Sequence, residues 1–278
     1  MGKVALVTGG NQGLGFALVR GLCAALGPED TLYLTARDPD KGHAAMEEIK
    51  TPTPRLRFAR LDVREPKGIA RLAATLQNRH GGVDIVLSNA AARIAKDRPQ
   101  SEQVRAFVDT NNHGTYRMLW SFMPVLRSNA RFVVVASSFG MLRNLPAPMR
   151  DRFDVARASM EDVAVSMNAY ADAVEQGRAQ QKSWPNWMNI PSKVGQVALA
   201  KVAARMIVTD RPGDGILINA ACPGLVDTAA SRPWFDDMSS AQSPGEAARG
   251  VLWLATLPAG TSTPSGELVQ FRRVVPWL

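Results

Sequence analysis

The chain has 278 residues, 46% of them apolar, so it can bury one large core and is predicted to form a single domain over residues 1–278. No apolar run reaches the length of about 18 residues that a membrane span requires. The first residues form an apolar strand and lack the basic, apolar and small-residue regions of a signal peptide, so the sequence predicts a cytoplasmic protein. The net charge of +8 comes from Lys and Arg scattered among Asp and Glu, which argues against nucleic-acid binding.

The predicted elements alternate in chain order between short β-branched apolar runs and longer segments of helical periodicity. The predicted strands cover residues 4–7, 31–36, 56–61, 83–87, 132–135, 216–221 and 267–271. The predicted helices cover residues 14–25, a polar stretch after residue 36, a segment that begins at Pro66, and residues 110–126, 192–208 and 246–257. The fold class is therefore α/β: a Rossmann-type, doubly wound, parallel sheet of seven strands.

An insert, roughly residues 142–185, separates the fifth strand from the helix that begins at Ser192. It is rich in Met, Ala and charged residues and is predicted to contain one or two helices. Right-handed crossovers place helices on both faces of such a sheet, and ligands bind at the carboxyl ends of its strands.

Two cysteines, Cys23 and Cys222, have neither metal-ligand spacing nor a disulfide pattern, so we expect no metal site. Cys23 lies on the apolar face of a predicted helix, which is typical of a core residue. Cys222 ends a predicted strand near the candidate site. A small buried hydrophobic role is favoured for it, with a reactive thiol as the alternative.

A glycine-rich turn, Thr-Gly-Gly-Asn-Gln-Gly-Leu-Gly at residues 8–15, follows the first strand. Gly9 permits a sharp turn, Gly13 lets the backbone approach a pyrophosphate, and Gly15 lets the helix pack against the strand. The N–H groups at the helix start then favour a phosphate. A glycine cluster alone is weak evidence, but its place between a buried strand and a helix indicates a dinucleotide site.

The second predicted strand, residues 31–36, is followed at its tip by Arg37 and Asp38. In NAD-binding proteins an acidic residue at this tip binds the ribose 2′-hydroxyl, whereas a guanidinium can pair with the 2′-phosphate of NADP. The tip therefore favours NADP(H) over NAD(H). A solvated surface arginine is the alternative interpretation.

These motifs resemble the short-chain dehydrogenase/reductase family over essentially the whole chain. The matching segments are residues 8–15, 61–63, 88–91 and 223–228. The resemblance implies that Asp62 contacts adenine and that Thr228 contacts the nicotinamide carboxamide. The cofactor-binding residues that follow from it are Gly9, Asn11, Gln12, Gly13, Leu14, Arg37, Asp62, Val63, Asn89, Ala90, Lys193, Pro223, Gly224, Val226 and Thr228.

Within that family the chain is most similar to the monomeric carbonyl reductases. Four features carry this similarity: the first residues of the chain, the Thr-Ala-Arg-Asp tip, the insert and the Cys-Pro-Gly run. In that subgroup the insert covers the surface that other members use to oligomerise. The resemblance therefore implies a monomer that binds NADP(H) and a small-molecule substrate.

The family's reductases use four catalytic residues: Asn, Ser, Tyr and Lys. The resemblance places them at Asn111, Ser138 and Lys193, with Asn189 where the tyrosine belongs. Four residues of separation put Asn189 and Lys193 on one helix face. An amide can lend a hydrogen bond to a substrate but cannot usefully release a proton. Losing a general acid typically costs about 10²–10⁴-fold in rate.

Replacement proton donors are few. Tyr33 lies in a strand and Tyr116 on another side of its helix; Tyr170 in the insert and His113 are conceivable, although ordinary packing is favoured for both. Lys193, acting through a water, is the better candidate.

Four tryptophans lie in or near the segments that would surround a substrate: Trp184 and Trp187 in and after the insert, Trp234 after residues 223–228, and Trp277 near the end of the chain. They could wall in a bulky polycyclic substrate, as in specialised biosynthesis, or pack in the core.

Three functions remain open. The first is an NADP(H)-dependent reductase of a carbonyl or of an activated imine or iminium, the last of which accepts hydride without a proton. The second is a non-redox isomerase or cyclase with NADP(H) as a structural element, and the third is a catalytically silent NADP-binding protein. Ser138 and Lys193 favour the first, whereas Asn189 favours the others.

Overall fold

The structure, a computed structural model, describes residues 2–50 and 52–278; Met1 and Thr51, which belong to the predicted single domain, lie outside them. One sheet joins every strand of the described residues. The strands are β1 (Val4–Val7), β2 (Thr31–Ala36), β3 (Arg55–Arg60), β4 (Val83–Ser88), β5 (Leu126–Val135), β6 (Leu217–Cys222), β7 (Leu268–Gln270) and β8 (Arg273–Val275). Their order is β3-β2-β1-β4-β5-β6-β7-β8. The order reverses between β1 and β4, where doubly wound sheets bind ligands.

The α/β Rossmann-type fold class is confirmed, with one strand more than predicted. β7 pairs antiparallel with β8 through a tight turn at Phe271 and Arg272, which have φ of 49° and 63°. Two-residue hairpins need this backbone conformation and usually place Asn or Gly there. Phe and Arg carry no such signal, so the hairpin could not be predicted. The other neighbouring strands pair in parallel, as expected.

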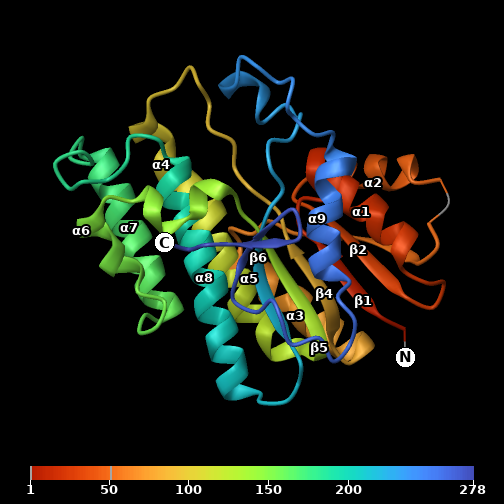
Figure 1. Ribbon diagram of the computed structural model, residues 1–278. Helices are drawn as coiled ribbons and strands as arrows, with labels where there is room; N and C mark the ends of the chain where they lie inside the picture. The colour runs from red at the N-terminus through yellow and green to blue at the C-terminus, as the bar shows by residue number, and fades with distance from the viewer. Residues whose placement is uncertain (1, 51) are drawn as a thin grey trace.

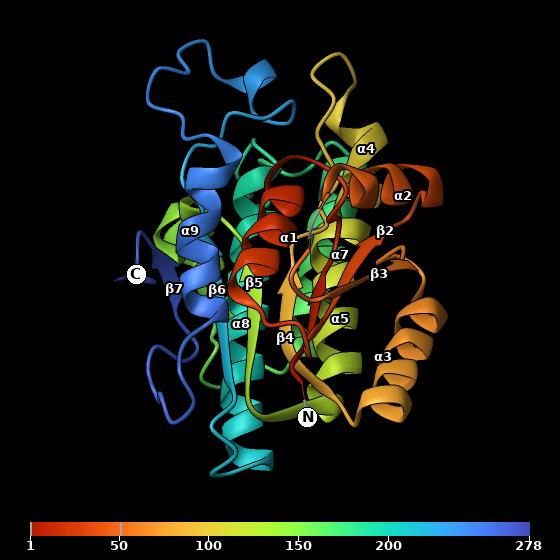
Figure 2. The ribbon, with the colours of Figure 1, turned by 90° about the vertical axis from the view of Figure 1, so that its right-hand side faces the viewer.

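Helices cover both faces of the sheet (Figures 1 and 2). They are α1 (Gly13–Ala25), α2 (Pro39–Glu48), α3 (Pro66–His80), α4 (Gln100–Val108), α5 (Gly114–Phe122), α6 (Ala147–Arg150), α7 (Met160–Glu175), α8 (Asn189–Asp210) and α9 (Pro244–Ala255). α1, α2 and α9 bury apolar residues against one face, and α3, α5 and α8 against the other. Burial on both faces explains the continuously apolar central strands.

Two helices differ from the prediction in extent. The helix predicted over 110–126 begins earlier, as α4, passes through a π-helical turn at Asp109–His113, and continues as α5. Its first part was missed, although Val104, Phe107 and Val108 have helical spacing and are buried. α8 begins three residues before the predicted start because Pro191 is tolerated in a first helical turn.

The insert contains two helices, α6 and α7, connected by short 3₁₀ turns. Ser159 caps α7 by accepting the Asp162 N–H, and the Asp162 carboxylate accepts the Ser159 N–H in return. α7 packs against α4 and α8 beside the sheet, and Figure 1 shows it at the left-hand edge. Within the described residues, the helices lack the combined length and apolarity that a bilayer crossing requires.

Candidate active site

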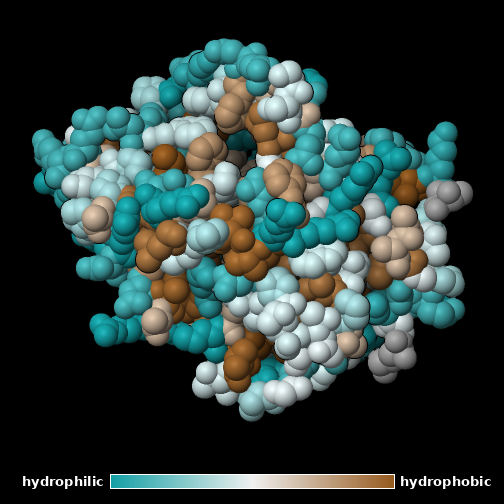
Figure 3. All heavy atoms as spheres, viewed as in Figure 1, coloured by the Kyte–Doolittle hydropathy of each residue, from teal (hydrophilic) through white to brown (hydrophobic). Residues whose placement is uncertain are grey.

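A crevice of about 540 Å³ runs along the carboxyl ends of the central strands. Its walls come from the segments that follow each of the strands β1 to β6 and from the start of α8. In Figure 3 a hollow opens near the top of the molecule with apolar residues on part of its rim. The predicted site residues that line the crevice are Gly9, Asn11, Gln12, Gly13, Leu14, Arg37, Asp62, Val63, Asn89, Ala90, Ser138, Asn189, Lys193, Gly224, Val226 and Thr228.

Backbone conformation or lack of space favours glycine at three positions of the glycine-rich turn. Gly9 and Gly13 have positive φ of 64° and 53°, which disfavours other residues. A Cβ at Gly15 would lie 2.1 Å from the Gly9 carbonyl oxygen and 2.6 Å from Asn89 Nδ2. α1 begins at Gly13, which lines the crevice, so the unpaired N–H groups of its first turn lie at the crevice. This backbone cradle fits a pyrophosphate.

Polar contacts from β4 hold this turn in place. The buried Thr8 hydroxyl accepts the N–H groups of Asn89 and Ala90 at 2.8 and 2.9 Å. The Asn89 amide donates to the Thr8 carbonyl at 3.0 Å. The segments after β1 and β4 are therefore locked together where the strand order reverses.

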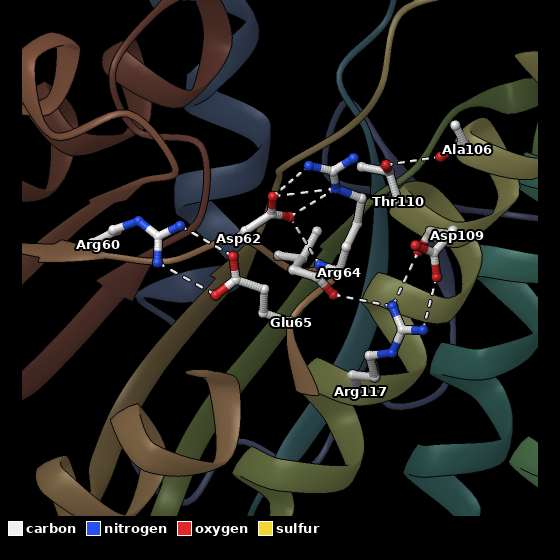
Figure 4. Close-up of polar contacts among 9 residues, drawn as sticks. Arg60, Asp62, Arg64, Glu65, Ala106, Asp109, Thr110 and Arg117 are labelled. Atoms are coloured by element: carbon white, nitrogen blue, oxygen red, sulfur yellow. Dashed lines mark hydrogen bonds and ion pairs between the residues drawn. The ribbon is translucent and has the colours of Figure 1, made fainter. Parts of the chain in front are cut away.

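The far end of the crevice carries charges that suit the adenosine half of a dinucleotide. Arg37 is exposed at the tip of β2 and lines the crevice, as does Asp62. Figure 4 shows Arg64 folded onto Asp62, with Nη2 to Oδ2 at 2.6 Å. Hydrogen bonding from the Arg64 side chain lowers the pKa of Asp62, despite its burial. Asp62 is therefore an ionised acceptor at neutral pH.

Ser138 is positioned by a 3₁₀ turn, Ser138–Gly140, directly after β5. The Asn144 amide fastens this turn by donating to the Ser138 and Phe139 carbonyls at 2.9 and 3.1 Å. A Cβ at Gly140 would lie 2.7 Å from the Lys193 carbonyl oxygen, so its absence lets the turn press against α8. Ser138 is thus brought beside the first turns of α8.

Asn189 and Lys193 lie one turn apart at the start of α8, and both line the crevice with Ser138. Within the described residues, the Asn189 side-chain amide has no hydrogen-bond partner, so it is free to bind a ligand. Lys193 Nζ donates to Gln196 Oε1 at 2.8 Å and to the Val135 carbonyl at 3.4 Å. Burial lowers the pKa of Lys193 to about 8, which makes its ammonium a proton donor near neutral pH.

Two predicted site residues lie outside the crevice. The Asn111 side chain is buried, and its Oδ1 accepts the Ala92 N–H at 2.7 Å, so it fixes the loop after β4 instead of facing a ligand. Pro223 lines a separate cavity, and its carbonyl accepts from Gln242 Nε2 at 3.0 Å. Gly224, with φ of 81°, turns the chain so that only the residues after Pro223 enter the crevice.

The tyrosine and histidine alternatives as proton donors lie outside the crevice lining. Tyr170 is fully buried in the core against Trp184, outside the crevice lining, and burial raises its pKa. Tyr116 reaches Glu161 at 3.4 Å, and His113 contacts Asn168 at 2.8 Å.

Cys222 is buried, and its Sγ accepts the Ser138 N–H at 3.1 Å. Burial raises the pKa of this thiol, so it is not a reactive thiolate. Cys23 is likewise buried, as expected.

Aromatic side chains wall the crevice beyond Ser138 and Asn189. The rings of Phe139 and Trp187 meet edge to face with centroids 4.7 Å apart, and Trp187 and Trp234 are 6.2 Å apart. All three line the crevice, whereas Trp184 is core, with 4% of its surface exposed. Trp277 lies outside the lining, where Lys201 approaches its ring.

The sequence analysis missed several residues near the reacting end. Phe139 and Arg93 line the crevice, each just beyond a segment that was recognised. Gln196 contacts Lys193 from within α8, and its place three residues further along a helix was a usable signal. Thr115 contacts Gln196 from α5 at 3.0 Å, and no local pattern indicates that pairing.

Comparisons with known proteins agree with this geometry. The family model described as short chain dehydrogenase matches residues 3–148. Carbonyl reductase (NADPH) 1 of Rattus norvegicus is 33% identical over 278 residues, covering 99% of this chain and 98% of the relative. The Homo sapiens protein of the same name is 32% identical with the same coverage.

Among solved structures, salutaridine reductase from Papaver somniferum has a TM-score of 0.81 at 23% identity and covers 96% of this chain and 99% of its own. That likeness supports the fold. The family model spans more than half of the chain, and both relatives exceed 30% identity over nearly all of it. The chain therefore belongs to the short-chain dehydrogenase family.

Proposed function

We propose that the protein is an NADP(H)-dependent oxidoreductase that reduces a carbonyl, or an activated imine or iminium, of a bulky substrate, with Asn189 in place of the tyrosine acid. One observation carries this proposal: Ser138, Asn189 and Lys193 line the same crevice as the glycine-rich turn. The NADPH-dependent names of the two carbonyl reductase relatives support the choice of cofactor.

The residues present fit the cofactor along the whole crevice. The turn at residues 9–15 would hold the pyrophosphate, Arg37 the 2′-phosphate, and Asp62 the adenine. Thr228 would contact the nicotinamide end from the opposite wall. When bound, NADPH supplies a hydride.

The chain itself must orient the substrate oxygen and supply a proton. The Ser138 hydroxyl and the Asn189 amide can both donate hydrogen bonds to that oxygen and stabilise its developing negative charge. Neither is a useful acid. The Lys193 ammonium, with its lowered pKa, is the nearest group that can release a proton, directly or through a water.

The substrate that suits this site is broad and apolar. Phe139, Trp187 and Trp234 present aromatic faces and edges beside the reacting groups. An iminium carbon needs only hydride, so a site without a phenol can reduce it. The same site can reduce a ketone if Lys193 supplies the proton. A role in specialised biosynthesis agrees with such a substrate.

The test measures NADPH oxidation in the presence of a panel of ketones, quinones and cyclic iminium compounds. The loss of the near-ultraviolet absorbance of NADPH reports the rate. We expect turnover of at least one class. Asn189→Tyr is expected to raise ketone turnover, by up to about 10²–10⁴-fold if the missing acid limits the rate. Its effect on an iminium substrate should be small, because that reaction needs no proton.

Asn189→Phe is the matched control, because it adds the ring without the hydroxyl. Only the tyrosine variant should accelerate ketone reduction. A ketone rate that stays the same or falls in Asn189→Tyr contradicts the role assigned to this position.

The alternative function is a non-redox isomerase or cyclase, or a silent NADP-binding protein. The amide at Asn189, which cannot usefully release a proton, favours it. Calorimetry with NADPH separates the possibilities. Tight binding without oxidation by any substrate class supports the alternative, and absence of binding contradicts every function that uses NADP(H).

We also propose that the protein acts as a monomer in the cytoplasm. The insert supports the monomeric state because α7 covers α4, with Arg105 paired to Asp172 at 2.6 Å and to Glu175. Sedimentation at micromolar concentration should give the mass of one chain.

A further inference from the structure

A buried chain of side-chain hydrogen bonds leads away from Lys193 into the protein. Lys193 Nζ donates to Gln196 Oε1 at 2.8 Å, and Gln196 Nε2 donates to Thr115 Oγ1 at 3.0 Å. The Thr115 hydroxyl then donates to the Asn111 carbonyl at 2.6 Å. Gln196 and Thr115 are 2% and 3% exposed, so water competes little for these contacts.

The chemistry of the groups dictates the direction of this chain. An ammonium has three donors and no acceptor, so the oxygen of the Gln196 amide must face Lys193 and its nitrogen must face Thr115. The Asn111 carbonyl, in the π-helical turn Asp109–His113, accepts the last hydrogen bond. The orientation of Gln196 is therefore fixed at both ends.

These contacts leave one Lys193 donor for the crevice. Gln196 and the Val135 carbonyl take two of its three N–H groups, and the described residues offer no acceptor for the third. Gln196 also opposes the effect of burial, because its oxygen favours the protonated lysine. Cys222, a titratable group that interacts with Lys193, also raises the pKa of the lysine, and burial raises the pKa of the thiol itself.

We propose that Gln196 is a positioning residue: through its contacts with Thr115 and Lys193 it orients the lysine ammonium toward the crevice and keeps it protonated. The proposal rests on the proposed function, because the state of Lys193 matters to catalysis only if Lys193 acts in the reduction. It adds a role for Asn111 through its backbone carbonyl, since the Asn111 side chain lies outside the crevice.

The test measures the titration of Lys193 in the intact protein without turnover. Competitive labelling with trace acetic anhydride, read by mass spectrometry, should show a midpoint near pH 8 for the parent. Gln196→Met keeps the size but removes the acceptor, and should lower the midpoint by about 1–2 pH units. Gln196→Glu places a carboxylate against the ammonium and should raise it by about 1–3 pH units.

Thr115 provides a second, independent perturbation if the Gln196 variants fold poorly. Thr115→Val leaves the Gln196 N–H groups without their acceptor and should lower the Lys193 midpoint, whereas Thr115→Ser keeps the hydroxyl and should restore it. Thr209→Val is the matched control, because Thr209 lies at the other end of α8 and, among the described residues, its hydroxyl bonds only to the Arg205 carbonyl. It should leave the midpoint unchanged.

The proposal is overturned if Lys193 titrates alike in the parent, Gln196→Met and Gln196→Glu, or if Thr115→Val behaves like Thr115→Ser. A purely structural role for Gln196 predicts that result. Because labelling needs no substrate, these outcomes are separate from a failure of the reductase assay. A protein that titrates as expected but reduces nothing overturns the proposed function and leaves the positioning role standing.

Discussion

The two ends of the crevice are built from different parts of the chain. The nucleotide end is mostly backbone, shaped by positions such as Gly13 and Gly15 where a Cβ is strained or does not fit. The reacting end is made of side chains, Ser138, Asn189 and Lys193, carried by a turn and a helix. A side chain can change on a helix without altering the helix, whereas the turn has little steric freedom. The difference implies that the residues of the reacting end can vary more freely than those of the nucleotide end.

Removing the amine is the largest expected perturbation of the reacting end. Lys193→Met keeps much of the apolar stem but deletes the donor, and we expect a loss of about 10²–10⁴-fold in ketone reduction. Steady-state kinetics should show the loss in kcat, with NADPH binding by calorimetry as the control for the nucleotide end. A near-normal kcat would remove Lys193 from the reaction.

Adding one methyl group to the nucleotide end should act on binding instead. Gly15→Ala would place a carbon 2.1 Å from the Gly9 carbonyl oxygen. We expect NADPH affinity to fall by about 10–100-fold, since overpacking costs about 1–3 kcal/mol. Gly250→Ala is the matched control, because nothing lies within 4 Å of its added carbon. If both variants bind NADPH like the parent, the cradle is misassigned.

The pH dependence should report on the reacting end alone. If the Lys193 ammonium is the acid, ketone reduction stays constant below a pH of about 8, the lowered pKa of Lys193, and falls above it. The fall approaches about tenfold per pH unit because only the protonated form donates. Initial rates across this range test the prediction, and Lys193→Met should lack this alkaline limb. A flat profile in the parent would point to a substrate that needs no proton.

The smallest expected effect concerns the choice between cofactors. Arg37 is exposed, so its pairing with a 2′-phosphate is partly screened, and Arg37→Ala should weaken NADPH binding by about 3–10-fold. NADH binding should hardly change. Calorimetric titration with both cofactors measures the ratio, and equal losses would refute the phosphate assignment.

Most of the fold and the glycine-rich turn were accessible from local patterns, whereas the residues of the reacting end came from the resemblance to a family. Apolar runs and helical periods located the parallel strands, and the spacing of Asn189 and Lys193 placed both on one face of α8. The hairpin after β7 was not predictable, because Phe271 and Arg272 adopt a conformation that their side chains do not favour. For Trp187 the sequence left two alternatives open, a substrate wall or core packing, and the structure places it among the lining residues.

By itself the sequence determined where backbone room is needed and which residues repeat at helical or strand spacing, because both depend on near neighbours in the chain. Only the tertiary structure decided that the Asn111 side chain turns away from the crevice and that Thr115 on α5 meets Gln196 on α8. Thr115 and Gln196 are 81 positions apart in the chain, and the packing of whole elements brings them together. The spacing of residues along the chain does not indicate which distant side chains will meet.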